Sequence, residues 1–176
     1  TKHYDYIYGN NVYGTYNNFK SFDHLGNNGK GDGFRDYPAQ TQINVANRWN
    51  YEVHDGLCSQ TLINYTHEER LGGQMAFTKD MRGSDSIYGL GGTTDRVHFF
   101  TKNGAPLGNT SSFGTQVSAT YFKQDAYYGL SNYEGIETDV YANALVNTMV
   151  RGGHNVDFGA SFRYTDLEEN LYSTPY

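Results

Sequence analysis

Apolar and polar side chains alternate along three segments of the chain. In Thr41–Val53 the odd positions carry most of the apolar residues and the even positions most of the polar ones. In Asn155–Thr165 the even positions are Val, Phe, Ala, Phe and Tyr, and Phe113–Tyr121 alternates in the same way. Successive side chains of a β-strand point to opposite faces, so each segment is predicted to be a strand with one apolar and one polar face.

Four further segments show a weaker alternation, which brings the expected number of strands to about seven. These segments are Val12–Phe19, Leu57–Glu68, Arg96–Lys102 and Thr138–Val150. All three prolines fall outside the seven predicted strands, as a residue without a backbone N–H should. We therefore expect an all-β fold.

The predicted connections alternate between short and long. The short ones contain turn residues, at His54-Asp55-Gly56, Asn103-Gly104 and Gly152-Gly153-His154. The long ones are polar and cover roughly Lys20–Gln40, Arg70–Thr94 and Gln124–Glu137. An antiparallel up-and-down meander with short turns at one end and long loops at the other is typical of a transmembrane β-barrel.

The composition narrows the class of protein. The chain has 176 residues, a net charge of -6, a mean hydropathy of -0.71 and only 37% hydrophobic residues, yet it contains 17 Tyr and 10 Phe. This aromatic content argues against disorder, and the acidic balance argues against nucleic-acid binding. A single cysteine, Cys58, excludes a disulfide framework and a cysteine-rich zinc site.

A soluble β-sandwich also alternates apolar and polar residues, so the nature of the polar face matters. The polar positions here are mostly Asn, Gln, Ser, Asp, Arg and Gly, as expected for a water-filled lumen, whereas a sandwich usually exposes Lys, Glu and Thr. Trp49 and Tyr51 precede a short turn, where a barrel has its interfacial aromatic girdle. The pattern favours a barrel, and the sandwich remains the alternative.

The expected number of strands is seven, whereas bacterial single-chain barrels have an even number of strands. We therefore expect part of a larger barrel.

Several of these segments resemble the TonB-dependent outer-membrane receptors, most closely the cobalamin-receptor-like type of Bacteroidetes. The resemblance is carried by Asn47-Arg-Trp-Asn-Tyr51, by the run from Asn64 to Gln74 with its E-x-R-x-G-G-Q pattern, and by three later segments in the same order: Phe113–Leu130, Tyr141–Leu145 and Asp157–Tyr164.

This resemblance implies a barrel of about 22 strands with a plugged lumen in the outer membrane of a Gram-negative bacterium. Residues 1–176 are then expected to be one segment of that barrel, without the plug domain or the TonB box. The family's function implies binding and import of a scarce large ligand, with cobalamin as the best guess, driven by the TonB complex acting on the plug. Membrane lipid and a surface lipoprotein are the other expected partners. A passive outer-membrane channel and a soluble binding or adhesion module remain alternatives.

The loop around residues 27–36 resembles a calcium loop of the D-x-N-x-D-G-x-x-D kind. In that register Asn28, Asp32 and Asp36 are the candidate ligands, and Gly33 permits the sharp turn. The sequence departs from the pattern at Asn28, which stands for Asp, and at Lys30, which offers no oxygen. The alternative is an Asn/Gly surface loop with Asx turns.

Three tyrosines of the third predicted long loop, Tyr127, Tyr128 and Tyr133, are candidate contacts for a ligand or partner, because aromatic side chains give large, rigid contact areas. Loop packing is the alternative. Asp85, Asp95 and Arg96 are charged residues near the second long loop that could also contact a ligand.

No catalytic motif is found, and we expect no enzyme. The run His67-Glu68-Glu69-Arg70 lies on a predicted strand, where His67 and Glu69 share one face and the other two residues share the opposite face, so the four do not converge. There is no G-x-S-x-G elbow, and no Lys or Arg neighbours Cys58 in sequence.

Overall fold

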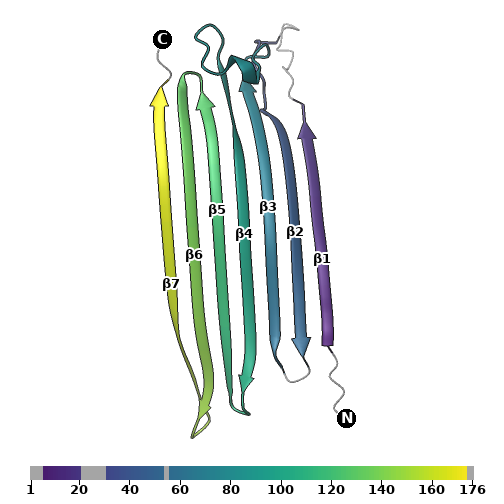
Figure 1. Ribbon diagram of the computed structural model, residues 1–176, viewed down its shortest axis with the longest axis vertical. Helices are drawn as coiled ribbons and strands as arrows, with labels where there is room; N and C mark the ends of the chain where they lie inside the picture. The colour runs from purple at the N-terminus through teal and green to yellow at the C-terminus, as the bar shows by residue number, and fades with distance from the viewer. Residues whose placement is uncertain (1–5, 21–30, 54–55, 174–176) are drawn as a thin grey trace.

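The computed structural model describes residues 6–20, 31–53 and 56–173, which form one antiparallel sheet of seven strands. The strands follow each other across the sheet in chain order (Figure 1). Their bounds are β1 Tyr6–Phe19, β2 Ala39–Val53, β3 Cys58–Gly73, β4 Gly89–Leu107, β5 Ser111–Tyr128, β6 Ser131–Val150 and β7 His154–Ser173. The predicted all-β, up-and-down meander is confirmed. The sheet is open, because β1 and β7 are not paired with each other.

The strands are much longer than their alternating segments. β7 has 20 residues, and Asn155–Thr165 covers only its first half. In the second half the apolar residues Leu167 and Leu171 are at odd positions and lie on the polar face. The alternation thus changes phase, and for this reason the sequence pattern does not show that the strand continues. Typical strands of globular proteins have about 5–6 residues, so each of these strands extends far beyond an ordinary sheet.

Two short connections, at residues 108–110 and 151–153, lie at the end of the sheet where β2 ends and β3 begins. The long connection 74–88 lies at the other end, where β1 ends and β2 begins (Figure 1). The prediction of a third long loop over Gln124–Glu137 is wrong, because only Gly129 and Leu130 separate β5 from β6. Gly129 has a φ of 61°, a positive value that a tight two-residue hairpin requires at its first central position.

The predicted turn at Asn103-Gly104 is also displaced, since β4 continues to Leu107. Pro106 therefore lies inside a strand, contrary to the prediction that every proline lies outside the strands. The last pair between β3 and β4 joins Cys58 to Gly104, so Pro106 has a neighbouring strand on one side only. This is an edge position, where proline is tolerated.

The register sorts the side chains of the sheet into two faces. One, here called the apolar face, carries the odd positions of β2–β5 and the even positions of β1, β6 and β7, among them Ile43, Val45, Val97, Val156 and Phe158. The polar face carries the remaining positions, among them Gln42, Asn64, Gln116, Asn143 and Ser161. The prediction of one apolar and one polar face is thus confirmed.

The middle of the apolar face is uncovered. Val45 is 46% exposed and Phe158 is 57% exposed, at opposite sides of the sheet. Within residues 6–20, 31–53 and 56–173 there is no second sheet that packs on these side chains.

Buried side chains gather instead where the connection 74–88 folds against the start of β4 and the end of β5. Phe77 is 2% exposed and Tyr127 is 6% exposed, with ring centroids 6.0 Å apart. A Cβ at Gly89 would lie 2.2 Å from the ring of Phe77, so glycine is needed there for the loop to lie down on the sheet. This connection also holds the short 3-10 helix η1, Lys79–Met81. In the part of the chain that the structure describes, no helix has the length and apolar character to cross a membrane.

Candidate functional site

A hollow of about 590 Å³ lies on the polar face, across β2–β5 near the ends that join the two long connections. We call it the polar groove. Its lining includes Gln42, Asn44, Glu68, Arg70, Arg96 and Gln124. The volume falls within the ~300–1,000 Å³ that is usual for small-molecule sites.

Small residues form one end of the polar groove. Arg70, Gly92 and Ala126 stand side by side on β3, β4 and β5. A Cβ at Gly92 would lie 2.5 Å from the backbone oxygen of Asp125, so glycine allows β5 to approach β4 here. Gly92 has no side chain and that of Ala126 is a methyl group. The surface is therefore hollow at these two positions, between larger lining residues such as Arg70 and Gln124.

The charges of the polar groove are only partly balanced. Glu68 forms an ion pair with Arg70, and Gln42 Nε2 donates a hydrogen bond of 3.2 Å to Glu68 Oε2. Arg96 is exposed and, among the described residues, has no hydrogen bond or ion pair with an acidic side chain. The polar groove therefore contains one compensated ion pair and one uncompensated positive charge.

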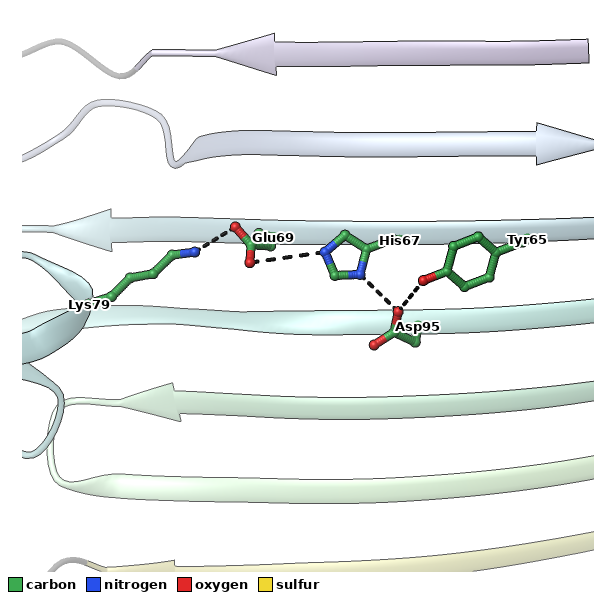
Figure 2. Close-up of polar contacts among 5 residues, drawn as sticks. All are labelled: Tyr65, His67, Glu69, Lys79 and Asp95. Carbon is green, nitrogen blue, oxygen red and sulfur yellow. Dashed lines mark hydrogen bonds and ion pairs between the residues drawn. The ribbon is translucent and has the colours of Figure 1, made fainter.

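A chain of polar contacts crosses from β3 to β4 on the other face of the sheet (Figure 2). Tyr65 Oη donates a hydrogen bond of 2.8 Å to Asp95 Oδ1, and His67 Nδ1 lies 2.8 Å from the same oxygen. An ionised carboxylate only accepts hydrogen bonds, so His67 is assigned as the donor. Glu69 lies 4.0 Å from His67 Nε2 and accepts a hydrogen bond of 2.5 Å from Lys79 Nζ of the connection 74–88.

This contact chain marks the loop-side border of the apolar face. The next register row toward the sheet centre holds Val45, Tyr65, Val97 and Tyr121, whereas the row of His67 and Asp95 also holds Lys123. The His67 ring lies between two carboxylates, and neither of its nitrogens has a hydroxyl or thiol partner among the contacts of the described residues. The arrangement can link β3, β4 and the loop, and it balances their charges locally.

An arginine clamps the connection 74–88 onto the sheet. Arg82 donates two hydrogen bonds to Asp125, at 2.7 and 3.0 Å, and one of 2.9 Å to Asn132 Oδ1. Its guanidinium carbon lies 4.9 Å from the ring centroid of Tyr127, a cation–π geometry. The hydrogen bonding to Asp125 raises the pKa of Arg82 above its ordinary value, so the clamp stays charged.

A second arginine joins the two long connections. Arg35 Nη1 donates a hydrogen bond of 2.6 Å to the backbone oxygen of Gln74, and Nη2 donates one of 3.1 Å to that of Phe77. Phe34 and Gln74 also form an isolated antiparallel bridge. The two loops are thus held together beside the polar groove.

The predicted calcium loop is described only in part. Asn28 lies outside the described residues. Asp32 Oδ1 accepts a hydrogen bond of 2.9 Å from the backbone N–H of Phe34, which is an Asx turn as the alternative expected. Among residues 6–20, 31–53 and 56–173 no group of three or more His, Cys, Asp or Glu side chains could hold a metal ion. Calcium binding by Asn28, Asp32 and Asp36 stays a prediction.

The three candidate tyrosines are not loop residues, because no long loop exists between β5 and β6. Tyr127 is buried on the apolar side under the connection 74–88, whereas Tyr128 and Tyr133 lie on the polar face. Tyr128 is 54% exposed and borders the polar groove, and Tyr133 Oη donates a hydrogen bond of 2.7 Å to Glu169. They do not form one cluster, and ligand contact by any of them stays a prediction.

Of the residues singled out near the second long loop, Asp95 lies in the contact chain of Figure 2 and Arg96 lines the polar groove. The sequence did not reveal the contacts around His67, because Asp95, which joins His67 to Tyr65, comes from the neighbouring strand β4. The Arg82 clamp was missed as well, since Arg82 and Asp125 are 43 residues apart.

Comparisons of the chain with protein-family models, with curated proteins and with solved structures gave no match.

Proposed function

We propose that this sheet is part of the wall of a transmembrane β-barrel in the outer membrane of a Gram-negative bacterium, and that the barrel belongs to a TonB-dependent receptor. The observation that carries the proposal is the uncovered apolar face. Exposed apolar side chains extend across the whole sheet on that face, from Val12 on β1 to Phe162 on β7. A lipid environment would cover them.

The length of the apolar segment fits a bilayer. On β7 the apolar side chains of this face run from Val156 to Tyr164. A transmembrane strand needs about 9–11 residues, which matches this segment, while the rest of the strand would extend into water. Tyr65 and Tyr121 lie at the loop-side end of the band, and Trp49 lies nearer the other end, where aromatic girdles are expected.

The polar face fits a water-filled interior. Its carboxamides and hydroxyls bond to each other across strands, for example Asn64 to Asn44 at 2.7 Å and Asn143 to Ser161 at 2.7 Å. The two unpaired edges of the described sheet would be costly in a bilayer, so further strands are needed to close a barrel.

Within such a barrel, the proposed activity is binding of a scarce large ligand at the cell surface and its import with energy from the TonB complex. Cobalamin is the best single guess. Support for the receptor class comes from the segments that resemble that family, above all the E-x-R-x-G-G-Q run from Glu68 to Gln74.

The test of this function is growth of the source bacterium on limiting cobalamin after deletion of the gene. The proposal expects slow growth that is restored by the full-length gene, but not in a strain without a working TonB protein. Restoration without TonB would instead indicate a passive channel. A full-length protein that is soluble and monomeric without detergent would indicate the β-sandwich module.

A further inference from the structure

The geometry points to the polar groove as a binding site for a small organic anion, whose carboxylate or phosphate group pairs with Arg96. The inference goes beyond the proposed function and rests on it in one respect, because the polar face must be the watery side of the barrel wall.

The charge of the polar groove favours an anion. The acidic side chain in the lining, Glu68, is 16% exposed and already paired with Arg70. Arg96 lies between the uncharged Thr66 and Phe122, with Glu137 one strand further on, and it has no hydrogen bond or ion pair with an acidic side chain among the described residues. A site with one uncompensated guanidinium group favours an anion, and arginine binds carboxylates and phosphates through two parallel hydrogen bonds.

The polar groove also offers neutral hydrogen-bonding groups. Asn44 Oδ1 accepts a hydrogen bond from Asn64, and the amide nitrogen of Asn44 has no acceptor among the described residues. Gln42 uses its amide nitrogen on Glu68, which leaves its carbonyl oxygen as an acceptor. The polar groove thus has oriented groups of both kinds for the uncharged part of a ligand.

The size and lining of the polar groove suit a small organic molecule. The hollow of about 590 Å³ is of small-molecule dimensions. Phe122 and Tyr128 add aromatic surface beside the polar groups, which suits the carbon skeleton of an organic solute.

The test uses the full-length protein in detergent and two probes that differ by one phosphate group, glucose 6-phosphate and glucose. Isothermal titration calorimetry at low ionic strength should show binding of glucose 6-phosphate that is at least about tenfold tighter than that of glucose, since a charged hydrogen bond has roughly that effect. Glucuronate in a parallel titration distinguishes a preference for carboxylate from one for phosphate.

The variant Arg96→Gln should weaken glucose 6-phosphate binding about tenfold and leave glucose binding unchanged. The matched control is Arg48→Gln, because Arg48 is another exposed arginine of the polar face but does not line the polar groove. Retention of the folded form is checked for both variants by their migration in unheated gels.

The inference is overturned if neither anion binds at millimolar concentration, if glucose binds as tightly as glucose 6-phosphate, or if both arginine variants lose affinity equally. The last outcome would show a general surface potential and no site at Arg96. Each of these failures is separate from a failure of the proposed receptor, which would be seen in the growth experiment and in the location of the protein.

Discussion

Neighbouring residues of one strand have opposite environments in this sheet. Ala160 and Ser161 are adjacent in β7, yet Ala160 lies on the apolar face opposite Ala144, and Ser161 lies on the polar face and accepts a hydrogen bond from Asn143. If lipid covers the apolar face, the same substitution should have very different costs at these two positions.

The substitution Ala160→Arg should therefore destabilise the full-length protein folded in phospholipid vesicles by about 2–4 kcal/mol, the cost of an arginine at the lipid face near the midplane. Ser161→Arg is the control and should cost about 1 kcal/mol at most, the value of one lost hydrogen bond. Urea titration of the vesicle-bound protein measures both. Equal effects of the two substitutions would argue against a lipid-facing Ala160.

The clamp of Arg82 makes a second prediction at this scale. Arg82→Gln removes the paired hydrogen bonds to Asp125, but both side chains are more than 30% exposed, so solvent screening limits the effect to about 1 kcal/mol. Hydrogen exchange at the amides of Phe77 and Met81 should become about fivefold faster, because the connection 74–88 opens more often.

Asp85→Asn is the matched control for this loop, because it changes a charge on the same connection without removing a contact that holds the loop down. Its exchange rates should stay those of the native protein. Unchanged exchange in Arg82→Gln would mean that Phe77 and its burial hold the loop without the clamp.

At the scale of elements, the strand centres were predictable and their ends were not. Alternation identifies β2, β5 and β7 because Ile43, Val117 and Phe158 alternate with polar neighbours. It fails where strands extend beyond the apolar band, as at Gly89–Thr94 of β4, because the residues there other than Leu90 are small or polar.

The candidate sites depended on register, which the sequence does not contain. Arg96 could be noted as a charged residue, but its position beside Thr66 and Phe122 follows from the pairing of β3, β4 and β5. The glycine at position 73 of the E-x-R-x-G-G-Q run is likewise explained only by the folded structure. A Cβ at Gly73 would lie 2.6 Å from the backbone oxygen of Tyr88, so this glycine lets β3 end close against the start of β4.

The short turn between β5 and β6 provides a test at the element scale. Gly129→Ala forces a residue with a Cβ into a positive φ and should destabilise the folded protein by about 1–2 kcal/mol. Gly114→Ala, in the same strand pair, is the control. Its φ is not positive and its new Cβ would lie 3.7 Å from the nearest atom, an ordinary contact. Urea titration of both variants compares them directly, and equal stabilities would contradict a strained turn at Gly129.

At the scale of the whole molecule, the sheet has two faces that demand different surroundings and two edges that demand partners. A bilayer on one side, water on the other and further strands at the edges satisfy all of these demands in a closed barrel. A second packed sheet could satisfy the apolar face equally well, so the medium that touches Val156 and Phe158 distinguishes the two architectures.

The measurement that tests this most directly is spin-label accessibility along β7 in the full-length protein in lipid vesicles, with Cys58→Ser as the background. Labels are placed singly at each position from 156 to 164. The account predicts a period of two, with the even positions accessible to dissolved oxygen in the lipid and the odd positions accessible to a water-soluble nickel complex. Even positions that are shielded from both reagents, or open to the nickel complex, would contradict it.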